Sequence, residues 1–436
     1  MMEKNLSIYI HIPFCIKKCD YCDFLSFACE DVKLREEYVN TVIREIKRSE
    51  FAGRHVSTVF FGGGTPSILT PVQIGAILDT LRTCFDVAKD AEISLECNPG
   101  TATEEKLKGF YDIGINRLSI GMQSANDEEL KRLGRVHDFA QFCDTYRYAR
   151  EAGFTNINVD IMSALPGQSL QSYMDTLDKV VSLGPEHISA YSLIIEEGTP
   201  FYEIYGDCEE QGDYESLPDE DTEREMYYET DRRLTEAGYH RYEISNYARD
   251  GYECAHNKVY WTGDDYLSFG IGASSYVDGA RFSNIEDIYA YMKFVNKEES
   301  VLYDDDVIFE YPCDRAWDSD MDPMYFDEET CDEDMSNDTL YEATVNGPEE
   351  VEWREGIHRL SVNERMEEFM IVGLRLMCGV SKTVWRKRFD VDIESVYGPV
   401  LEKLKTQELI ECTDERIRLT TRGIDVSNQV LAQFLL

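Results

Sequence analysis

Six short runs with strand character alternate with helix-compatible stretches between Leu6 and Leu193. The strand candidates are Ser7–His11, Ser57–Phe61, Glu92–Cys97, Arg117–Gly121, Asn156–Ile161 and His187–Ser192. The helix candidates between them are Val32–Ser49, Pro71–Thr83, Thr103–Tyr111, Phe139–Ala152 and Leu170–Leu183. Because strand–helix–strand units join parallel strands by right-handed crossovers, this alternation predicts an α/β fold with a parallel sheet. Six units, rather than eight, predict an open, partial (β/α)6 barrel of the TIM type.

Residues suited to chemistry gather at the C-terminal ends of the predicted strands. They are Cys15–Cys22, Gly62–Ser67, Glu96–Pro99, Gln123 and Asp160. In a parallel barrel these ends meet at one face, where functional groups collect. We therefore expect one functional site at that face.

Cys15, Cys19 and Cys22 have C-x3-C-x2-C spacing on the loop that follows the first predicted strand. Thiolates are soft ligands that suit iron–sulfur clusters, and a complete cubane site uses four of them. Three thiolates leave one iron open to a ligand that does chemistry, much as an open zinc site does. The spacing predicts a [4Fe–4S] cluster. The other cysteines show no ligand spacing, so we expect them to be small buried hydrophobes.

Composition limits the compartment and the partners. The 85 acidic and 43 basic residues give a formal charge of −42, which argues against nucleic acid because phosphate contacts require a basic surface. No run of 18 apolar residues exists, so we expect no transmembrane segment. The N-terminus resembles neither a signal nor a transit peptide. Thirteen scattered cysteines without an export signal favour a cytoplasmic protein with free thiols.

The composition changes sharply after the barrel candidate. Between Asp304 and Glu355, twenty acidic residues accompany two basic ones, which is typical of a solvated or disordered insertion. Within it, the run Asp318–Glu329 is similar to a calcium-binding loop, but Pro323 stands where that loop needs glycine. The predicted organisation is a barrel with its extension at 1–300, an acidic insertion at 301–355 and a C-terminal domain at 356–436.

The last 80 residues have the pattern of a compact helical domain. We expect helices at Asn363–Leu376, Val384–Phe389 and Ile393–Thr406, a β-hairpin within Leu409–Leu419, and a final helix at Thr421–Leu435. Helices with a short hairpin favour a winged-helix-like domain, although the acidity of the chain argues against DNA binding. Before the acidic insertion, the Gly-rich run Leu267–Tyr276 predicts a tight loop against the core.

The run Phe61-Gly62-Gly63-Gly64-Thr65-Pro66-Ser67 lies between a predicted strand and a predicted helix. Together with the three cysteines it resembles the radical S-adenosylmethionine (SAM) superfamily. The resemblance implies that the glycine strip approaches the methionine moiety of SAM. It also implies that the amino and carboxylate groups of SAM occupy the open iron.

Further motifs resemble the oxygen-independent coproporphyrinogen III oxidases and their relatives. They are Tyr9-Ile-His-Ile-Pro-Phe-Cys15, Glu96-Cys-Asn-Pro99, Asn116–Ser124, Leu133-Gly-Arg-Val-His137 and Asn158–Gln168. This resemblance implies a SAM pocket formed by Tyr9, Gly64, Thr65, Glu96, Gln123, Arg135 and Asp160. Carboxylates there can accept hydrogen bonds from ribose hydroxyls or an amino group, and Arg135 can hold a carboxylate.

Three features separate the branches of this subgroup. The decarboxylase has a further cysteine at the position of Phe24 and a longer arm before the cluster. The motif His256-Asn-Lys-Val-Tyr-Trp261 resembles the heme-binding motif of the heme chaperone (HemW) branch. That branch implies His256 as the heme ligand, since imidazole is a common axial ligand and aromatic rings can contact a porphyrin face. Cys254 remains an alternative thiolate beside the heme.

The resemblance leaves several functions open. The favoured one is a heme chaperone that binds heme, a [4Fe–4S] cluster and SAM, and delivers heme to respiratory hemoproteins. Its other implied partner is a small electron donor such as flavodoxin or ferredoxin, and peripheral membrane contact remains open. The alternative is a coproporphyrinogen III oxidase, in which the reduced cluster cleaves SAM to start radical decarboxylation of propionates. A third hypothesis is a radical enzyme for another substrate, with His256 structural.

Overall fold

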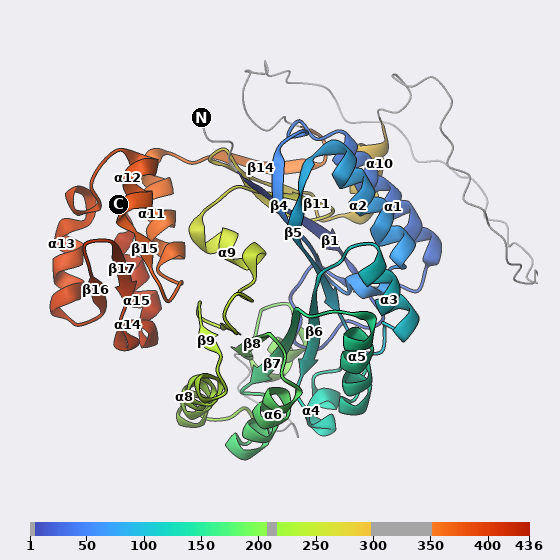
Figure 1. Ribbon diagram of the computed structural model, residues 1–436, viewed down its shortest axis with the longest axis horizontal. Coiled ribbons are helices and arrows are strands. Elements are labelled where there is room, and N and C mark those ends of the chain that lie inside the picture. Colours follow the sequence, from blue (N-terminus) through green and yellow to red (C-terminus); the bar gives the residue numbers. More distant parts are fainter. Residues whose placement is uncertain (1–4, 207–215, 298–350) are drawn as a thin grey trace, which may run out of the picture.

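The computed structural model describes residues 5–206, 216–297 and 351–436 (Figure 1). The acidic segment 304–350 and the calcium-loop-like run lie outside the described residues. The described strands include one twelve-stranded mixed sheet, which remains open at both ends. The predicted partial barrel is confirmed, because the strands at the centre of this sheet follow one another in chain order and are parallel. These six strands are β1 (Leu6–Ile12), β4 (His55–Gly63), β5 (Asp86–Cys97), β6 (Arg117–Gln123), β7 (Ile157–Ser163) and β8 (His187–Ser192).

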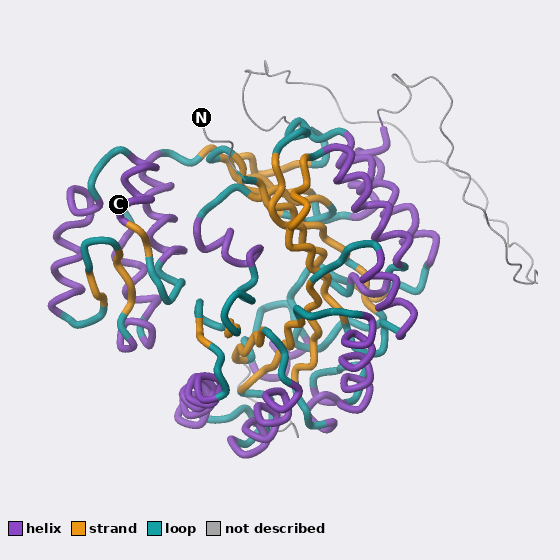
Figure 2. Tube along the Cα trace, in the orientation of Figure 1, coloured by secondary structure: helices purple, strands orange, loops and turns teal. Residues whose placement is uncertain are grey.

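Helices cover the outer face of this parallel sheet (Figures 1 and 2). They are α1 (Val32–Lys47), α2 (Pro71–Cys84), α3 (Glu104–Asp112), α4 (Asp127–Arg132), α5 (Phe139–Ala152) and α6 (Leu170–Leu183). Local signals fix several of their ends. Thr70 begins α2 with a capping box, Asp138 does the same for α5, and Gly153 ends α5 in the left-handed conformation.

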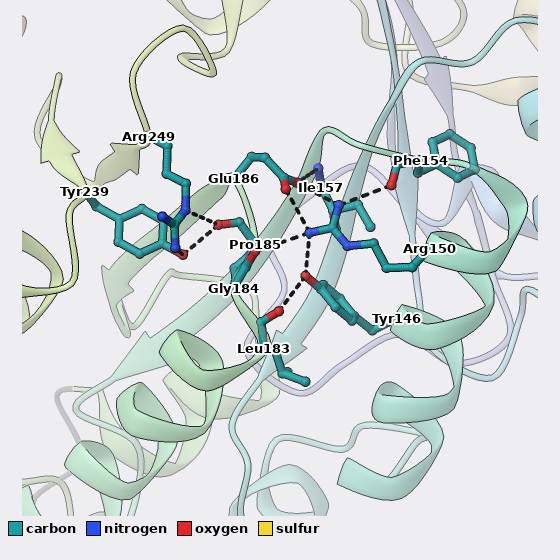
Figure 3. Close-up of polar contacts among 10 residues, drawn as sticks. All are labelled: Tyr146, Arg150, Phe154, Ile157, Leu183, Gly184, Pro185, Glu186, Tyr239 and Arg249. Carbon is teal, nitrogen blue, oxygen red and sulfur yellow. Dashed lines mark hydrogen bonds and ion pairs between the residues drawn. The ribbon is translucent and has the colours of Figure 1, made fainter.

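An ion pair, distant in sequence from the cysteines, connects helix α5 with the last two parallel strands of the barrel (Figure 3). Arg150 on α5 donates from both terminal nitrogens to Glu186, each at 2.9 Å. Glu186 also accepts from the backbone N–H of Ile157, the first residue of β7, at 3.0 Å. Because Glu186 immediately precedes β8, this bidentate contact joins α5, β7 and β8 at the N-terminal ends of the strands.

The sheet continues on both sides of the barrel strands. On the β1 side it adds β11 (Tyr266–Phe269), β12 (Ser274–Val277), β13 (Ala280–Asn284) and β14 (Arg354–Arg359). On the β8 side it adds β10 (Asn246–Ala248) and β9 (His240–Arg241). The connecting helices are α7 (Pro200–Tyr205), α8 (Glu220–Glu236), α9 (Ala255–Thr262) and α10 (Ile288–Asn296). Because β14 joins this sheet, the sheet extends beyond the boundary at 355 that composition suggested.

The Gly-rich run 267–276 differs from the predicted loop. Its first residues form β11, which pairs in parallel with β1, and its last residues form β12. Only the middle of the run forms a turn, and Gly270 in this turn has φ +100°. A Cβ on Gly270 would lie 2.5 Å from the Tyr38 hydroxyl and 2.8 Å from the His11 carbonyl oxygen. Glycine is therefore required by a close approach between two adjacent strands, not by a long loop.

The C-terminal module, residues 360–436, has a hydrophobic core of its own around Trp385. It comprises α11 (Val362–Gly373), β15 (Val380–Ser381), α12 (Lys382–Phe389), α13 (Ile393–Thr406), β16 (Ile410–Cys412), β17 (Arg416–Leu419), α14 (Thr421–Asp425) and α15 (Ser427–Leu431). The predicted hairpin gains β15 as a third strand. The continuous final helix predicted at Thr421–Leu435 is wrong. Val426, at φ −120° and ψ 30°, interrupts it, so that Val430 and Phe434 reach the core.

Helix α9 lies between the barrel and the C-terminal module (Figure 1). Its C-terminal end is tied to the module by Arg388, which donates to the carbonyl oxygens of Thr262 at 3.0 Å and Gly263 at 2.8 Å. Arg388 also forms an ion pair with Asp264 at 2.6 Å. A second ion pair joins Arg281 of β13 to Glu368 of α11 at 2.9 Å. The module therefore has defined contacts with the barrel sheet and with α9.

Candidate functional site

A cavity of about 280 Å³ lies at the C-terminal ends of the barrel strands. It is lined by the three predicted cluster ligands, Cys15, Cys19 and Cys22. It is also lined by six of the seven predicted SAM residues, namely Gly64, Thr65, Glu96, Gln123, Arg135 and Asp160. The structure thus brings together, from β2 to β7, side chains that are up to 145 positions apart in the sequence.

The cysteine loop is held at both ends by backbone pairing. Short parallel strands β2 (Phe14–Cys15) and β3 (Phe27–Ala28) bracket it. Inside the loop, the Asp20 N–H donates to the Leu133 carbonyl at 3.2 Å, and the Asp20 carbonyl accepts from the Phe201 N–H at 2.9 Å. These contacts fix the region between Cys19 and Cys22 against two other segments of the barrel face.

The glycine strip lies directly against the cysteine strand. The Gly64 N–H donates to the Ile12 carbonyl at 2.8 Å, and the Thr65 N–H donates to the Phe14 carbonyl at 2.8 Å. A Cβ on Gly64 would lie 2.9 Å from the Phe14 carbonyl oxygen. The strip therefore needs glycine in order to approach the backbone that carries Cys15.

The three thiols are free, and each has a different setting. Cys15 is buried and accepts a hydrogen bond from the Thr65 hydroxyl at 3.4 Å, while Cys19 and Cys22 are half-buried. Burial raises the pKa of Cys15 and of Cys22, which favours the neutral thiols until a metal is bound. Among the described residues no group of His, Cys, Asp or Glu converges to hold a single metal ion. Three soft donors spread around one cavity fit a multi-iron cluster, in which each thiolate binds a different iron.

Arg135 spans the cavity wall between the cysteine loop and the strand ends. It donates to the Gly121 carbonyl at 2.7 Å, to the Asn98 side chain at 3.1 Å and to the Cys19 sulfur at 3.6 Å. Burial lowers its pKa, but the nearby Tyr21 and Cys19 raise it by more, so the guanidinium stays charged. Its Nε is buried without a hydrogen-bond partner among the described residues. A fixed cation beside a cluster ligand can hold a ligand carboxylate.

Two carboxyl groups face this cavity from barrel strands β5 and β7, which lie on either side of β6. Glu96 accepts from the Gly63 N–H at 3.1 Å, and Asp160 accepts from the Asn158 amide at 2.7 Å. Burial, reinforced by the nearby Asp160, raises the pKa of Glu96 to about 8. Burial also raises the pKa of Asp160. Two desolvated carboxyl groups favour a ligand that offers hydrogen-bond donors or positive charge.

Two of the predicted SAM residues, Tyr9 and Gln123, have features that the sequence did not predict. Tyr9 does not line the cysteine cavity but an adjoining one of about 350 Å³, which shares Gly63 and Glu96 with it. Gln123 ends β6 at φ +67°, an uncommon conformation for a residue with a side chain, and accepts from the Tyr191 hydroxyl at 3.0 Å. Backbone strain at a cavity wall is typical of a functional position.

His256, predicted to bind heme, is buried in contact with the barrel interior. One ring nitrogen is 2.8 Å from the Thr58 hydroxyl, and the other is 3.0 Å from the Tyr260 hydroxyl. Burial lowers its pKa to about 3. The ring stacks on Phe60 at 5.1 Å and lines neither of the two cavities above. Both ring nitrogens are therefore within hydrogen-bond distance of hydroxyl groups, and His256 as the heme ligand stays a prediction.

Glu92 and Tyr191 of this region were missed by sequence reasoning, whereas Cys254 and Asn98 lie in segments that it considered. Glu92 accepts from the backbone N–H groups of Ala255 at 2.9 Å and His256 at 3.0 Å, and so holds the start of α9. Cys254 is buried, and its thiol donates to Glu92 at 3.4 Å. Asn98 and Tyr191 line the cysteine cavity. Tyr191 lies near the C-terminal end of β8, a signal that could have identified it.

Comparisons with family models agree with this architecture. Residues 9–180 match the model of the radical SAM superfamily. Residues 360–426 match the model of the HemN C-terminal domain. The first match contains the cysteines and the strand-end residues, and the second lies within the C-terminal module.

Comparisons with individual proteins extend over nearly the whole chain. Heme chaperone HemW of Bacillus subtilis (strain 168) is 31% identical over 432 residues, which are 98% of this chain and 99% of that protein. Heme chaperone HemW of Lactococcus lactis is 30% identical over 436 residues, 100% of this chain and 99% of that protein. The solved structure of coproporphyrinogen III oxidase (HemN) from Escherichia coli has a TM-score of 0.75 at 24% identity, and the match covers 99% of this chain and 90% of that one. This structural match shows a shared fold.

Proposed function

The chain belongs to the HemW heme chaperone family within the radical SAM superfamily, and from this premise we propose that it binds heme and delivers it to respiratory hemoproteins. The observation that carries the proposal is similarity along the entire chain to two proteins named heme chaperones, at 30% and 31% identity. The similarity includes the C-terminal module as well as the barrel. Among the described residues, no helix has the length and apolar character needed to cross a membrane.

We propose that Cys15, Cys19 and Cys22 hold the [4Fe–4S] cluster. Three free thiols on one loop, all facing one cavity, support this assignment. Bound there, the cluster would supply one iron without a protein ligand, which SAM can occupy. The protein's part is to hold the loop rigid through β2, β3 and the glycine strip.

The proposed SAM site is the remainder of the same cavity. Arg135 holds the carboxylate of SAM, while Glu96 and Asp160 accept hydrogen bonds from its amino group and ribose. Gln123 forms part of the wall. Tyr9, which lines the adjoining cavity, is assigned a supporting role beside Glu96. A small electron donor such as flavodoxin or ferredoxin would reduce the cluster.

A second candidate function is coproporphyrinogen III oxidation, favoured by the fold shared with the solved HemN structure. Phe24 argues against it, because it stands where that enzyme has a further cysteine. Its ring is 62% exposed at the mouth of the cavity and offers no ligand to a metal.

The test reconstitutes the cluster under anaerobic conditions and then measures two properties of the same preparation. Heme is titrated while the Soret band is recorded, and decarboxylation of coproporphyrinogen III is assayed separately. Stoichiometric heme binding without decarboxylation is the expected result. Decarboxylation at a catalytic rate, or failure to bind heme, would contradict the proposal.

A further inference from the structure

Helix α9 brings His256 close to a cavity that its ring does not line. This adjoining cavity has a volume of about 350 Å³, within the range of roughly 300–1,000 Å³ that is typical of small-molecule sites. Tyr9 and Tyr260 are among its lining residues. His256 is 1% exposed, and the ring centres of Tyr9 and Tyr260 lie 6.5 and 5.4 Å from its own. His256 therefore lies behind the wall that these two tyrosines form.

The Tyr260 hydroxyl covers the ring nitrogen of His256 that is nearer to this cavity. Its oxygen is 3.0 Å from Nε2, and it makes no other hydrogen bond in the described part of the chain. The two residues are four positions apart on α9, so they lie on the same face of the helix. The other nitrogen, Nδ1, is 2.8 Å from the hydroxyl of Thr58 on β4. Thr58 lines neither the adjoining cavity nor the cysteine cavity, so its hydroxyl approaches the ring from the barrel core.

The two hydroxyls suit different roles towards an iron. A histidine that binds a metal through one ring nitrogen normally donates from the other to an oxygen, which fixes the orientation of the ring. Thr58 can accept that N–H from Nδ1 at its present position. Tyr260, by contrast, stands between Nε2 and the adjoining cavity. An iron that approaches from the cavity therefore has to replace the Tyr260 hydroxyl, whereas the Thr58 hydroxyl stays in place.

The adjoining cavity has surfaces that suit a porphyrin. Phe24 lines both this cavity and the cysteine cavity, and it is 62% exposed. Together with the tyrosines it offers aromatic rings to a flat apolar ligand. Lys18 donates to the Phe24 carbonyl at 3.0 Å, which places a cation at this opening in a chain of 85 acidic and 43 basic residues. A flat ligand with carboxylates along one edge fits, with its apolar part inside and the carboxylates at the opening.

We propose that Tyr260 acts as a gate on His256: its hydroxyl has to leave Nε2 before the iron of a heme in the adjoining cavity can bind there. The inference rests on the proposed heme binding, with His256 as the ligand. The hydrogen bond between Tyr260 and Nε2 breaks, and one bond between Nε2 and the iron forms. The imidazole stays neutral, with its one proton on Nδ1 facing Thr58. The Tyr260 hydroxyl keeps its proton and turns to solvent, and the oxidation state of the iron is unchanged.

Stopped-flow absorption with ferric heme and the full-length protein, with its cluster reconstituted, separates entry from iron binding. Entry into the cavity should be a fast phase whose rate increases with heme concentration. Release of Tyr260 should follow as a slower phase that saturates and ends in the spectrum of imidazole-ligated heme. Tyr260→Phe keeps the ring and removes only the hydroxyl. It should accelerate the slower phase and tighten heme binding about fivefold, the effect of one net hydrogen bond, while the rate of entry is unchanged.

Thr58→Val removes the other hydroxyl of the same pair and should have the opposite effect. Without an acceptor for the Nδ1 proton, heme binding should weaken about tenfold, as is typical when the partner of a ligating histidine is lost. Thr58→Ser restores the hydroxyl and should restore most of the affinity. A purely structural role of the two hydroxyls would instead weaken binding in both Tyr260→Phe and Thr58→Val.

Tyr276→Phe is the control for loss of a tyrosine hydroxyl near the site. The ring of Tyr276 lies 6.2 Å from that of Tyr266, but Tyr276 lines neither cavity. Both kinetic phases should therefore equal those of wild type. Iron-free protoporphyrin provides a second control, because it has no metal for His256. Wild type and Tyr260→Phe should bind it equally well.

The outcomes separate the gate from the function on which it rests. A slower phase that Tyr260→Phe leaves unchanged or slows would overturn the gate while leaving heme binding intact. Tighter binding of iron-free protoporphyrin by Tyr260→Phe would also overturn it, since the hydroxyl would then act on the cavity and not on His256. An imidazole spectrum that persists in His256→Gln would show that another residue is the ligand. Absence of heme binding in wild type would instead overturn the proposed function itself.

Discussion

Gly64 and Cys15 approach so closely that a methyl group on Gly64 would lie 3.0 Å from the Cys15 sulfur. The same methyl group would lie 2.9 Å from the Phe14 carbonyl oxygen, which is backbone and cannot rotate away. We therefore expect Gly64→Ala to shift the cysteine strand and to lower the iron content after reconstitution by more than half. The measurement is iron and sulfide per chain together with the cluster absorbance.

The matched control is Gly75→Ala. Gly75 lies in α2, where an added Cβ would meet Ile113 at an ordinary distance of 3.5 Å. Its iron content should equal that of wild type. If Gly64→Ala also reconstitutes fully, the glycine strip does not set the position of Cys15.

Cys19→Ser should abolish the [4Fe–4S] absorbance, because a serine oxygen is a hard donor and a poor replacement for a thiolate. Cys19 lines the cavity with Cys15 and Cys22, and its sulfur accepts from Arg135. Cys143→Ser, on α5 and absent from that cavity, is the control and should keep the full signal. Retention of the cluster by Cys19→Ser would show that the ligand assignment is wrong.

Binding of SAM to the wild-type protein should release protons, and this release should be absent in Glu96→Gln. The pKa of Glu96 is about 8 because burial and Asp160 oppose its ionisation, with Arg117 acting in the opposite sense. The carboxyl group is therefore mostly protonated at pH 7 in the free protein. A ligand that offers positive charge or hydrogen-bond donors lowers this pKa, so the proton leaves on binding.

Calorimetry in two buffers of different ionisation enthalpy measures this release. At pH 7 the number of protons released per SAM should be larger for wild type than for Glu96→Gln, by a large fraction of one proton. The variant should also bind SAM about tenfold more weakly, as is typical when a charged hydrogen-bond partner is lost. Equal proton release in both proteins would remove Glu96 from the SAM site.

The local parts of this architecture could be predicted from sequence, because they depend on neighbouring residues. The helix predicted at Phe139–Ala152 has the predicted bounds, since a capping box and a C-terminal glycine define its ends. The strands that carry Glu96 and Asp160 near their C-terminal ends could also be predicted from the local pattern of residues. Their meeting in one cavity follows from a general property of parallel barrels.

Contacts between distant segments could not be predicted in the same way. Strand β11 pairs with β1 in a register that aligns Ser7 with Tyr266, and nothing within the run 267–276 reveals that partner. The motif around His256 predicts a heme ligand, but it could not reveal that the ring bonds to Thr58, 198 positions earlier. The break at Val426 likewise depends on what the last residues contact in the core of the module.

Glu92→Gln should loosen the start of α9. The side chain of Cys254, the N-cap residue, accepts no capping hydrogen bond, and Glu92 from β5 takes that role by accepting from the backbone N–H groups of Ala255 and His256. Glutamine has one acceptor oxygen and no charge to stabilise the helix N-terminus. Amide hydrogen exchange in 255–258 should accelerate about tenfold, which corresponds to about 1.4 kcal/mol. Glu128→Gln on the surface of α4 should leave exchange in α9 unchanged.

His256 should make the fold sensitive to acid. Its pKa is about 3 in the folded protein because it is buried, with Arg117 also opposing its charge, against about 6.5 in an unfolded chain. Between these values the unfolded state binds more protons, so the contribution to stability is complete above pH 6.5 and is lost as the pH falls. From pH 7 to pH 5 this loss is about 2 kcal/mol.

His256→Gln removes the titrating group while keeping atoms that can bond to Thr58 and Tyr260. We expect the variant to be less stable than wild type at pH 7, but its free energy of unfolding should fall about 2 kcal/mol less between pH 7 and pH 5. Urea unfolding at the two pH values measures both quantities. His358→Gln, at an exposed position of β14, is the control and should behave as wild type. The other buried histidines are present in all three proteins, so they contribute equally to the pH dependence of each. If the difference between the two pH values is the same in His256→Gln as in wild type, His256 is already accessible to protons in the folded protein.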